Sequence, residues 1–188
     1  MRVGVLALQG DFREHAELLE LLGVEAVKVR RPDNLDSIDG LIIPGGESTA
    51  ISKLLVSFGM MQPVRDFIKN KPVLATCAGL ILLSDEVEGK LESQELIGGL
   101  GIRASRNAYG SQTDSFEAEV ECNGVTENVA FIRAPKILET RQTKVVARLS
   151  GEPVAVQQGS MIAACYHPEI TGSTQLHRLF ITEIEKTK

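Results

Sequence analysis

The chain has few cysteines, no excess of basic residues and no long apolar run. Its three cysteines are an odd number without paired spacing, which argues against a disulfide framework and favours a reducing compartment. The formal net charge is −5, whereas a nucleic-acid partner would require a basic face. The apolar run near the N-terminus is too short for a signal peptide or a membrane span. We therefore expect a cytoplasmic protein with no nucleic-acid or membrane partner.

The composition is typical of one globular domain. Hydrophobic residues make up 43% of the 188 positions and charged residues 24%, as in ordinary folded domains. This length suffices for a substantial core but is short for two typical domains. The sequence has no internal repeat, linker or low-complexity stretch. We predict a single domain over residues 1–188.

The first half of the chain alternates short apolar runs with segments of helical spacing. The predicted strands are residues 3–8, 25–29, 41–43 and 73–75. The predicted helices between them are residues 12–22, the segment after Thr49 up to Phe58, and residues 61–70. Asp11 and Glu14 have the spacing of an N-cap residue and its reciprocal partner. This alternation predicts a parallel, doubly wound sheet, in which ligands bind beyond the carboxyl ends of the strands.

From about Gly101 onward the pattern changes to short strand-like runs with turn residues between them. These predicted strands are residues 116–122, 129–132, 145–149, 153–157 and 161–166, followed by a helix over residues 173–185. Asn123-Gly124 favours a hairpin. The predicted fold is therefore α/β with three layers: a flavodoxin-like, mostly parallel central sheet, helices on both faces, and additional antiparallel strands in the C-terminal half.

The stretch from Val73 to Gly79 carries the first candidate for chemistry. A short apolar run ends in Cys77, and a helical pattern follows. Such a strand-to-helix turn holds a nucleophile exposed above an α/β sheet and forces it into strained dihedral angles, so bulky neighbours would clash. Ala75 and Gly79 supply the room that this turn needs. Taken alone, a cysteine in this position is more often a small core residue.

His167-Pro168-Glu169 follows the last predicted strand and supplies the partners that a thiol nucleophile needs. Histidine is the side chain whose unperturbed pKa suits a base near neutral pH, and a carboxylate can hold its tautomer. Glu169 can therefore orient His167 while the other ring nitrogen faces Cys77. A zinc site made of Cys77, Cys165 and His167 is the weaker alternative, since it offers three scattered ligands; we expect no metal. The other two histidines lie within predicted helices and are assigned no catalytic role.

The Gly45-Gly46 turn is the third candidate element. It exposes backbone N–H groups at the start of a helix, where the dipole favours negative charge. We expect the N–H groups of Gly46 and Ala78 to stabilise an oxyanion. The alternative is a phosphate-binding turn, which the absence of a Walker-type lysine disfavours.

Together these residues resemble the triad glutamine amidotransferases, and more closely the glutaminase subunits of pyridoxal 5′-phosphate synthases. The resemblance runs nearly end to end. The matching motifs are Leu8-Gln9-Gly10, Glu14-His15, Pro44-Gly45-Gly46-Glu47-Ser48-Thr49, Cys77-Ala78-Gly79, Arg106-Asn107-Ala108-Tyr109-Gly110, Asp114-Ser115-Phe116, Phe131-Ile132-Arg133-Ala134-Pro135 and His167-Pro168-Glu169. The family commonly has arginine where this chain has Ser111, a departure outside the triad positions.

The resemblance implies a glutaminase in which Cys77 is the nucleophile and His167 and Glu169 form its relay. It implies a glutamine site lined by Gly46, Glu47, Ser48, Arg106, Ile132 and Arg133. An arginine fork suits an α-carboxylate, and a glutamate suits an α-ammonium. The implied partner is a synthase subunit that receives the ammonia within a large hetero-oligomer, and the chain itself would carry no cofactor. Gln9-Gly10 lies at a strand end beside the expected oxyanion site, so we expect this loop to reorganise when the partner docks.

Two alternatives stay open at this point. One is another thiol hydrolase with a cysteine elbow on a flavodoxin-like sheet, in which the working acid comes from an early strand. The other is a catalytically silent module that regulates a partner enzyme. The presence of Cys77, His167 and Glu169 together argues against the silent module.

Overall fold

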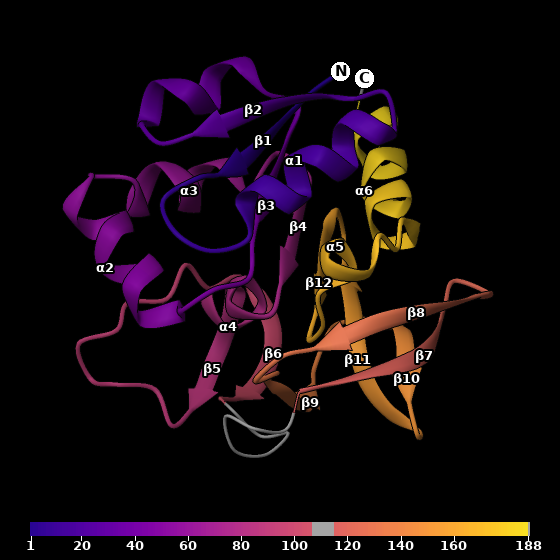
Figure 1. Ribbon diagram of the computed structural model, residues 1–188. Coiled ribbons are helices and arrows are strands. Elements are labelled where there is room, and N and C mark those ends of the chain that lie inside the picture. The colour runs from indigo at the N-terminus through magenta and orange to yellow at the C-terminus, as the bar shows by residue number, and fades with distance from the viewer. Residues whose placement is uncertain (107–114, 188) are drawn as a thin grey trace.

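The structure is a computed structural model that describes residues 1–106 and 115–187. Its parallel strands are β1 (Arg2–Leu6), β2 (Glu25–Val29), β3 (Gly40–Ile43), β4 (Val73–Thr76) and β12 (Met161–Ala164). They lie in the order β2-β1-β3-β4-β12 (Figure 1). This order, with each crossover formed by a helix or loop, is that of the flavodoxin-like doubly wound sheet. The predicted parallel core is therefore confirmed.

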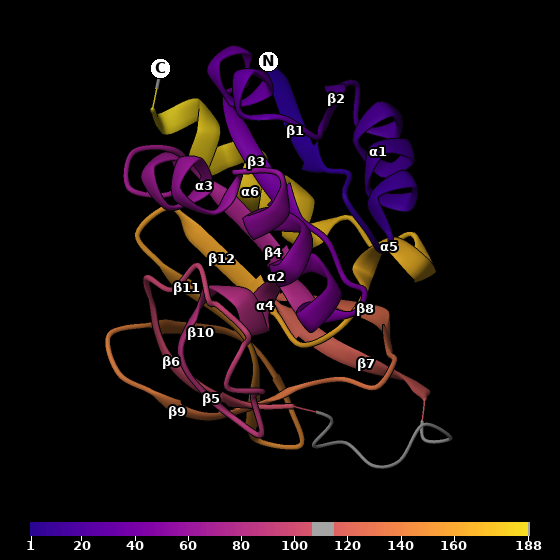
Figure 2. The same ribbon diagram turned by 90° about the vertical axis from the view of Figure 1, so that its left-hand side faces the viewer.

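Helices cover both faces of these parallel strands. They are α1 (Phe12–Leu21), α2 (Ser48–Ser57), α3 (Met61–Phe67), α4 (Ala78–Leu83), α5 (Pro168–Thr171) and α6 (Gln175–Lys186), with a 3-10 helix η1 at Pro32–Ser37. Figures 1 and 2 show α1 and α6 on one side of the sheet and α2 and α3 on the other. On the α6 side, a side chain at Gly40 would overlap Phe180 and Ile184, so helix and strand are in close contact. The three predicted layers are present.

Beyond β12 the same sheet continues with antiparallel strands, as predicted. In spatial order these are β11 (Glu152–Gln158), β10 (Lys144–Leu149), β7 (Phe116–Cys122) and β8 (Val125–Phe131). Asn123 and Gly124 have φ angles of 51° and 81° and form the turn between β7 and β8, which confirms the predicted hairpin. The backbone of Ala130 in β8 pairs with His167, so this antiparallel part reaches the end of β12.

Three further strands were not predicted from the sequence. They are β5 (Ser84–Glu88), β6 (Leu100–Ser105) and β9 (Lys136–Thr140), which form a separate three-stranded sheet. The β5 sequence, Ser-Asp-Glu-Val-Glu, is mostly charged and mostly exposed, so no apolar pattern marks it as a strand. By contrast, β3 and β4 are buried along their whole length, and both are visible in the sequence as continuous apolar runs.

Two local predictions need correction. Strand β12 ends at Ala164 rather than at Tyr166. Asp11 does occupy the N-cap position of α1, but its side chain makes no capping hydrogen bond there. The prediction concerning Ser111 lies outside the described residues, as do the other motif residues between 107 and 114. None of the described helices has both the length and the apolar character that crossing a membrane requires.

Candidate active site

The turn between β4 and α4 has the strained geometry that the sequence predicts. Cys77 has φ 46° and ψ −101°, a conformation that L-residues rarely adopt. Its backbone N–H donates to the carbonyl of Ala164 at 2.9 Å, which ties the turn to β12. A side chain at Gly79 would overlap the carbonyl oxygen of Ile43 and lie 3.1 Å from Cβ of Ala75. Because neighbours this close leave no space for a Cβ, only glycine fits at position 79.

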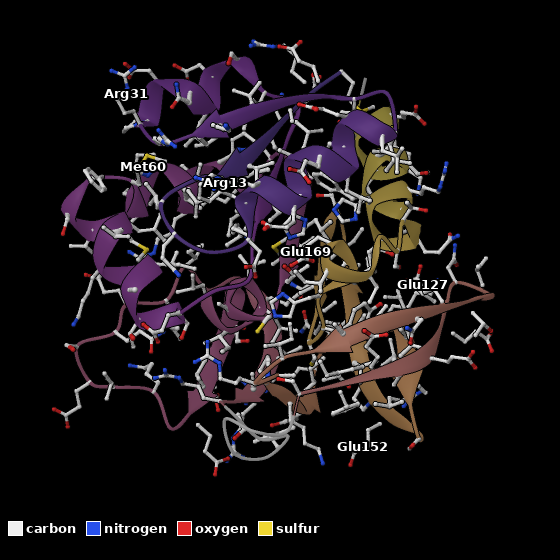
Figure 3. The ribbon with its side chains drawn as sticks, in the orientation of Figure 1. Arg13, Arg31, Met60, Glu127, Glu152 and Glu169 are labelled. Atoms are coloured by element: carbon white, nitrogen blue, oxygen red, sulfur yellow. The ribbon has the colours of Figure 1, made fainter. Side chains whose placement is uncertain are left out.

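His167 and Glu169 lie directly behind the cysteine. The backbone N–H of His167 donates to the carbonyl of Ala130 at 2.8 Å, which fixes the chain where it leaves β12. Nδ1 of His167 lies 2.8 Å from Oε1 of Glu169, and both side chains are buried. Figure 3 shows Glu169 in the interior of the molecule, close to α5. The imidazole also hydrogen-bonds the thiol of Cys77. The three predicted triad residues are therefore in contact, in the order thiol, imidazole, carboxylate.

A second carboxylate, Asp11, contacts the same imidazole and was not predicted as a site residue. Its Oδ2 lies 3.2 Å from Nδ1 of His167. The side chain that was expected to cap α1 therefore faces the site instead. The available signal was its position, since Asp11 follows β1 at the carboxyl edge of the sheet, where ligands of such folds bind.

The surroundings of His167 favour its protonated form. Burial alone would lower the pKa of His167, but hydrogen bonds to Asp11, Cys77 and Glu169 outweigh it and raise the pKa to about 12. Burial raises the pKa of Glu169, an effect that its ion pair with His167 only partly offsets. A protonated imidazole beside a thiol stabilises the thiolate, which is the nucleophilic form of cysteine.

These residues open onto a cavity of about 290 Å³, a volume suited to a small ligand. The cavity is lined by Gln9, Gly10, Asp11, Gly46, Glu47, Ser48, Cys77, Ile81, Arg106, Ile132, Arg133, His167 and Ile170. All of the residues predicted to bind substrate are in this set, as are both residues of the predicted gating loop. Glu169 lies behind His167, and Ala78 is buried at the first position of α4.

The charged groups of the cavity already have partners. Nη2 of Arg106 lies 3.2 Å from Oε1 of Glu47. Glu47 also caps α2, where its carboxylate accepts hydrogen bonds from the backbone N–H groups of Thr49 and Ala50. Burial opposes ionisation, but these hydrogen bonds and the charge of Arg106 lower the pKa of Glu47. Gln94 also contacts Arg106, at 3.4 Å, and no sequence pattern marks it as a site residue.

Two backbone features complete the cavity wall. The thiol of Cys77 lies 3.8 Å from the carbonyl oxygen of Ile132, and Arg133 next to it has a positive φ of 46°. On the opposite wall, the side-chain oxygen of Gln9 accepts a hydrogen bond from the backbone N–H of Glu47 at 2.9 Å. The predicted gating loop thus contacts the turn that contains Gly46.

The zinc alternative does not fit the arrangement found. Among the described residues, the group whose potential ligand atoms lie close together is Asp11, His167 and Glu169, within 4.8 Å of one another. Cys165 does not belong to it; burial raises the pKa of its thiol, which disfavours the thiolate that binds metal. Since Nδ1 of His167 is hydrogen-bonded to Glu169, the three residues form a relay, and we assign them no metal.

A strained elbow cysteine, an imidazole and a buried carboxylate on a flavodoxin-like sheet define a class of enzymes with a thiol nucleophile. Comparison with known proteins narrows this class. Residues 5–186 match the SNO glutamine amidotransferase family, and the chain belongs to that family.

The similar proteins cover the whole chain. A protein of Carboxydothermus hydrogenoformans named pyridoxal 5′-phosphate synthase subunit PdxT is 45% identical, over 99% of both chains. One of Mycolicibacterium vanbaalenii with the same name is 47% identical, over 97% of both. A solved structure described as a glutamine amidotransferase superposes with a TM-score of 0.92 at 43% identity, covering 97% of this chain and 98% of that one. The structure of a putative GMP synthase component of Thermoplasma acidophilum, with a TM-score of 0.68 and 17% identity over 99% and 94% of the two chains, shares the fold.

Proposed function

We propose that this chain is the glutaminase subunit of a pyridoxal 5′-phosphate synthase. It hydrolyses L-glutamine to L-glutamate and ammonia, and the ammonia passes to a synthase subunit for the synthesis of pyridoxal 5′-phosphate. The observation that carries the proposal is the contact between Cys77, His167 and Glu169 at the cavity. Membership of a glutamine amidotransferase family and full-length relatives named as subunits of this synthase support the choice of reaction.

The chemistry follows from the positions of these groups. The Cys77 thiolate attacks the side-chain carboxamide of glutamine, and the backbone N–H groups of Gly46 and Ala78 bind the oxyanion of the tetrahedral intermediate. Protonated His167 gives its proton to the departing ammonia, which leaves a glutamyl thioester on Cys77. A water molecule, deprotonated by His167, then attacks the thioester and releases glutamate. Glu169 keeps the imidazole oriented through both steps. These steps require no metal and no cofactor.

The cavity wall opposite the nucleophile supports recognition of the amino-acid end of glutamine. Arg106 and Arg133 are the cations available for the α-carboxylate, and the carboxylate of Glu47 is available for the α-ammonium. Because Arg106 and Glu47 are paired in this structure, substrate would have to exchange partners with that ion pair. Ser48 and Ile132 complete the binding surface.

The loop at Gln9 and Gly10 supports the proposal that docking of the synthase subunit controls activity. Gln9 is hydrogen-bonded to the backbone N–H of Glu47, directly after Gly46. A side chain at Gly46 would lie 2.6 Å from Oε1 of Gln9 and 2.9 Å from Cα of Gly10. This close contact means that a movement of the loop changes the oxyanion turn. Glutamine hydrolysis would therefore be faster with the synthase subunit than without it, and equal rates would exclude this control.

The proposal extends to the setting of the reaction. The core cluster contains residues from both halves of the chain, which supports one domain over residues 1–188. The three free thiols support a reducing compartment, which we propose to be the cytoplasm. The protein would act in a large hetero-oligomer with the synthase subunit.

Cys77→Ala tests the proposed function. We expect this variant to release no ammonia from glutamine in the presence of the synthase subunit, because no other group at the cavity can form the thioester. Circular dichroism and thermal unfolding should show an intact fold. Cys122→Ala is the matched control, since it removes a buried thiol from β7, outside the cavity, and should hydrolyse glutamine like the wild type. Ammonia release by Cys77→Ala at the wild-type rate would refute the assignment.

One observation favours the alternative thiol hydrolase whose acid comes from an early strand. Asp11 follows β1 and contacts the same nitrogen of His167 as Glu169 does, at 3.2 Å against 2.8 Å. If Glu169 is the working acid, Glu169→Gln should lower kcat by roughly 100-fold or more, and Asp11→Asn by much less. The reverse order of effects would favour the alternative. A catalytically silent module would instead show a Cys77 no more reactive toward iodoacetamide than an ordinary cysteine, even with the synthase subunit bound.

A further inference from the structure

Two buried histidines lie behind the carboxylate of the triad, on the side away from the cavity. His15 is on α1 and His177 on α6, and neither has any exposed surface. Nδ1 of His15 lies 2.9 Å from Nε2 of His177, across 162 positions of sequence. Nε2 of His15 lies 3.1 Å from the hydroxyl of Thr76, the residue before the nucleophile. No step of the proposed mechanism uses this imidazole pair.

The pair is continuous with the triad through Glu169. Its Oε1 contacts His167, and its other oxygen, Oε2, lies 3.4 Å from Nε2 of His15. Among the described residues, Oε2 has no hydrogen-bond partner at shorter range. His15 is therefore the polar group positioned to interact with that oxygen. The contacts form one line from the cavity into the core: thiol, imidazole, carboxylate, imidazole, imidazole.

Both histidines of the pair are neutral. Burial lowers the pKa of His15 and the pKa of His177, and a charge on either would repel the other. A neutral imidazole has one N–H group and one acceptor nitrogen, so the two rings must share their protons in one of two ways.

The environment decides between these two arrangements. In the first, Nε2–H of His177 donates to Nδ1 of His15, and Nε2–H of His15 then points toward Thr76 and Oε2 of Glu169. Nδ1 of His177, which has no partner among the described residues, is then an empty acceptor. In the second, that same Nδ1 would be a buried donor without an acceptor, and a lone pair of His15 would face the carboxylate. Because a buried unpaired donor and a lone pair against a carboxylate are both unfavourable, the first arrangement holds.

We propose that His15 is a positioning residue for the glutaminase reaction, with its Nε2–H directed at Glu169 and its tautomer set by His177. The proposal rests on the proposed function for its kinetic consequences. An N–H group directed at Oε2 stabilises the ionised carboxylate in an apolar interior and holds its rotamer, so that Oε1 stays on Nδ1 of His167. His15 acts on Cys77 only through these two residues.

A purely structural role explains the pair less well. The other buried positions of α1 and α6 are mostly apolar, at Leu18, Leu19, Leu176, Phe180 and Ile184. A leucine at position 15 would fill the same interior without burying polar nitrogens. The polar pair lies where it contacts Glu169, and its nitrogens are oriented along the triad.

Histidine NMR on the wild-type protein is the first test, and it does not depend on any variant folding. The chain has only three histidines, so ¹⁵N labelling gives a small set of ring resonances that single variants can assign. We expect neutral His15 and neutral His177, each protonated on Nε2. Protonation of either on Nδ1, or a charged His15 near neutral pH, would overturn the proposal. This readout stands whether or not the chain hydrolyses glutamine.

Kinetics of position-15 variants in the complex with the synthase subunit form the second test. His15→Leu removes the donor, and His15→Gln retains an amide N–H for Glu169 and an oxygen for His177. We expect His15→Leu to lower kcat roughly tenfold with little change in KM. His15→Gln should recover most of that loss. Leu19→Ala, one turn further along α1, is the control for lost stability and should change neither kcat nor its pH profile.

The pH profile separates a positioning role from a structural one. The groups that face Glu169 are His167, Asp11 and His15, with Thr76 and His177 contacting His15 and Cys77 contacting His167. Loss of the His15 donor disfavours the ionised carboxylate, so the acidic limb of kcat should move to higher pH in His15→Leu. The pH dependence of Cys77 alkylation should move the same way. Unchanged limbs in both measurements, or an effect equal to that of Leu19→Ala, would overturn the proposal; a wild-type complex that leaves glutamine intact but shows the alkylation shift would refute only the proposed function.

Discussion

Gly45→Ala provides a sharp test of the site geometry, because one added methyl group meets the catalytic imidazole. A Cβ at position 45 would overlap Cε1 of His167 and lie 2.8 Å from its Nδ1, and it would lie 2.9 Å from Oδ2 of Asp11. Ordinary van der Waals contact begins at 3.4 Å, so Nδ1 must move by at least 3.4 − 2.8 = 0.6 Å. The ring is almost fully buried and held at 2.8 Å from Glu169, so this movement disturbs the relay itself.

The expected magnitude follows from that displacement. Misplacing a catalytic group by about 1 Å can reduce the rate about 100-fold, so we expect kcat to fall roughly 10- to 100-fold. Overpacking in a buried site should lower the free energy of unfolding by about 1–3 kcal/mol. The assay is glutamate formation by the complex with the synthase subunit, together with the rate of Cys77 alkylation. Both should fall in parallel.

The matched control is Gly101→Ala, the same chemical change at a position outside the cavity. A Cβ there would lie 3.1 Å from the side-chain oxygen of Gln158, the end of a flexible side chain that can move aside. This variant should retain wild-type kcat. A folded Gly45→Ala protein with wild-type kcat and alkylation rate would show that His167 does not need the position seen here, and the proposed relay geometry would be refuted.

Two further predictions concern stability. Burial lowers the pKa of His177 to about 3, so its contribution to stability is complete above its unfolded pKa of about 6.5 and is lost as the pH falls; between pH 7 and pH 5 this loss is about 2 kcal/mol. Denaturant unfolding at the two pH values should therefore show a loss smaller by that amount in His177→Gln, and an equal loss would contradict the buried neutral state. Glu47→Ala removes the N-cap of α2 and the partner of Arg106, so it should lower the free energy of unfolding by about 1 kcal/mol and raise KM for glutamine; an unchanged KM would remove Glu47 from substrate binding.

The parts of the fold that the sequence predicts are those with a strong local pattern. The strands β3 and β4 are buried on both faces, so their residues are apolar without interruption, and the hairpin turn needs the positive φ angles that Asn123 and Gly124 tolerate. Strand β5 has neither kind of signal. It is a strand because β6 pairs with it, and such pairing leaves no periodicity in a charged, exposed segment.

The same distinction separates the predicted from the unpredicted site residues. By itself the sequence determined the cysteine turn, since a strained elbow restricts its near neighbours to small residues, and it determined the imidazole and carboxylate, since His167 and Glu169 are two positions apart and meet locally. Only the tertiary structure decided that Asp11 faces His167 instead of capping its helix, and that His15 meets His177 and Glu169. These contacts join elements far apart in the chain, and their distances depend on how helices pack across the sheet, which no local spacing of residues encodes.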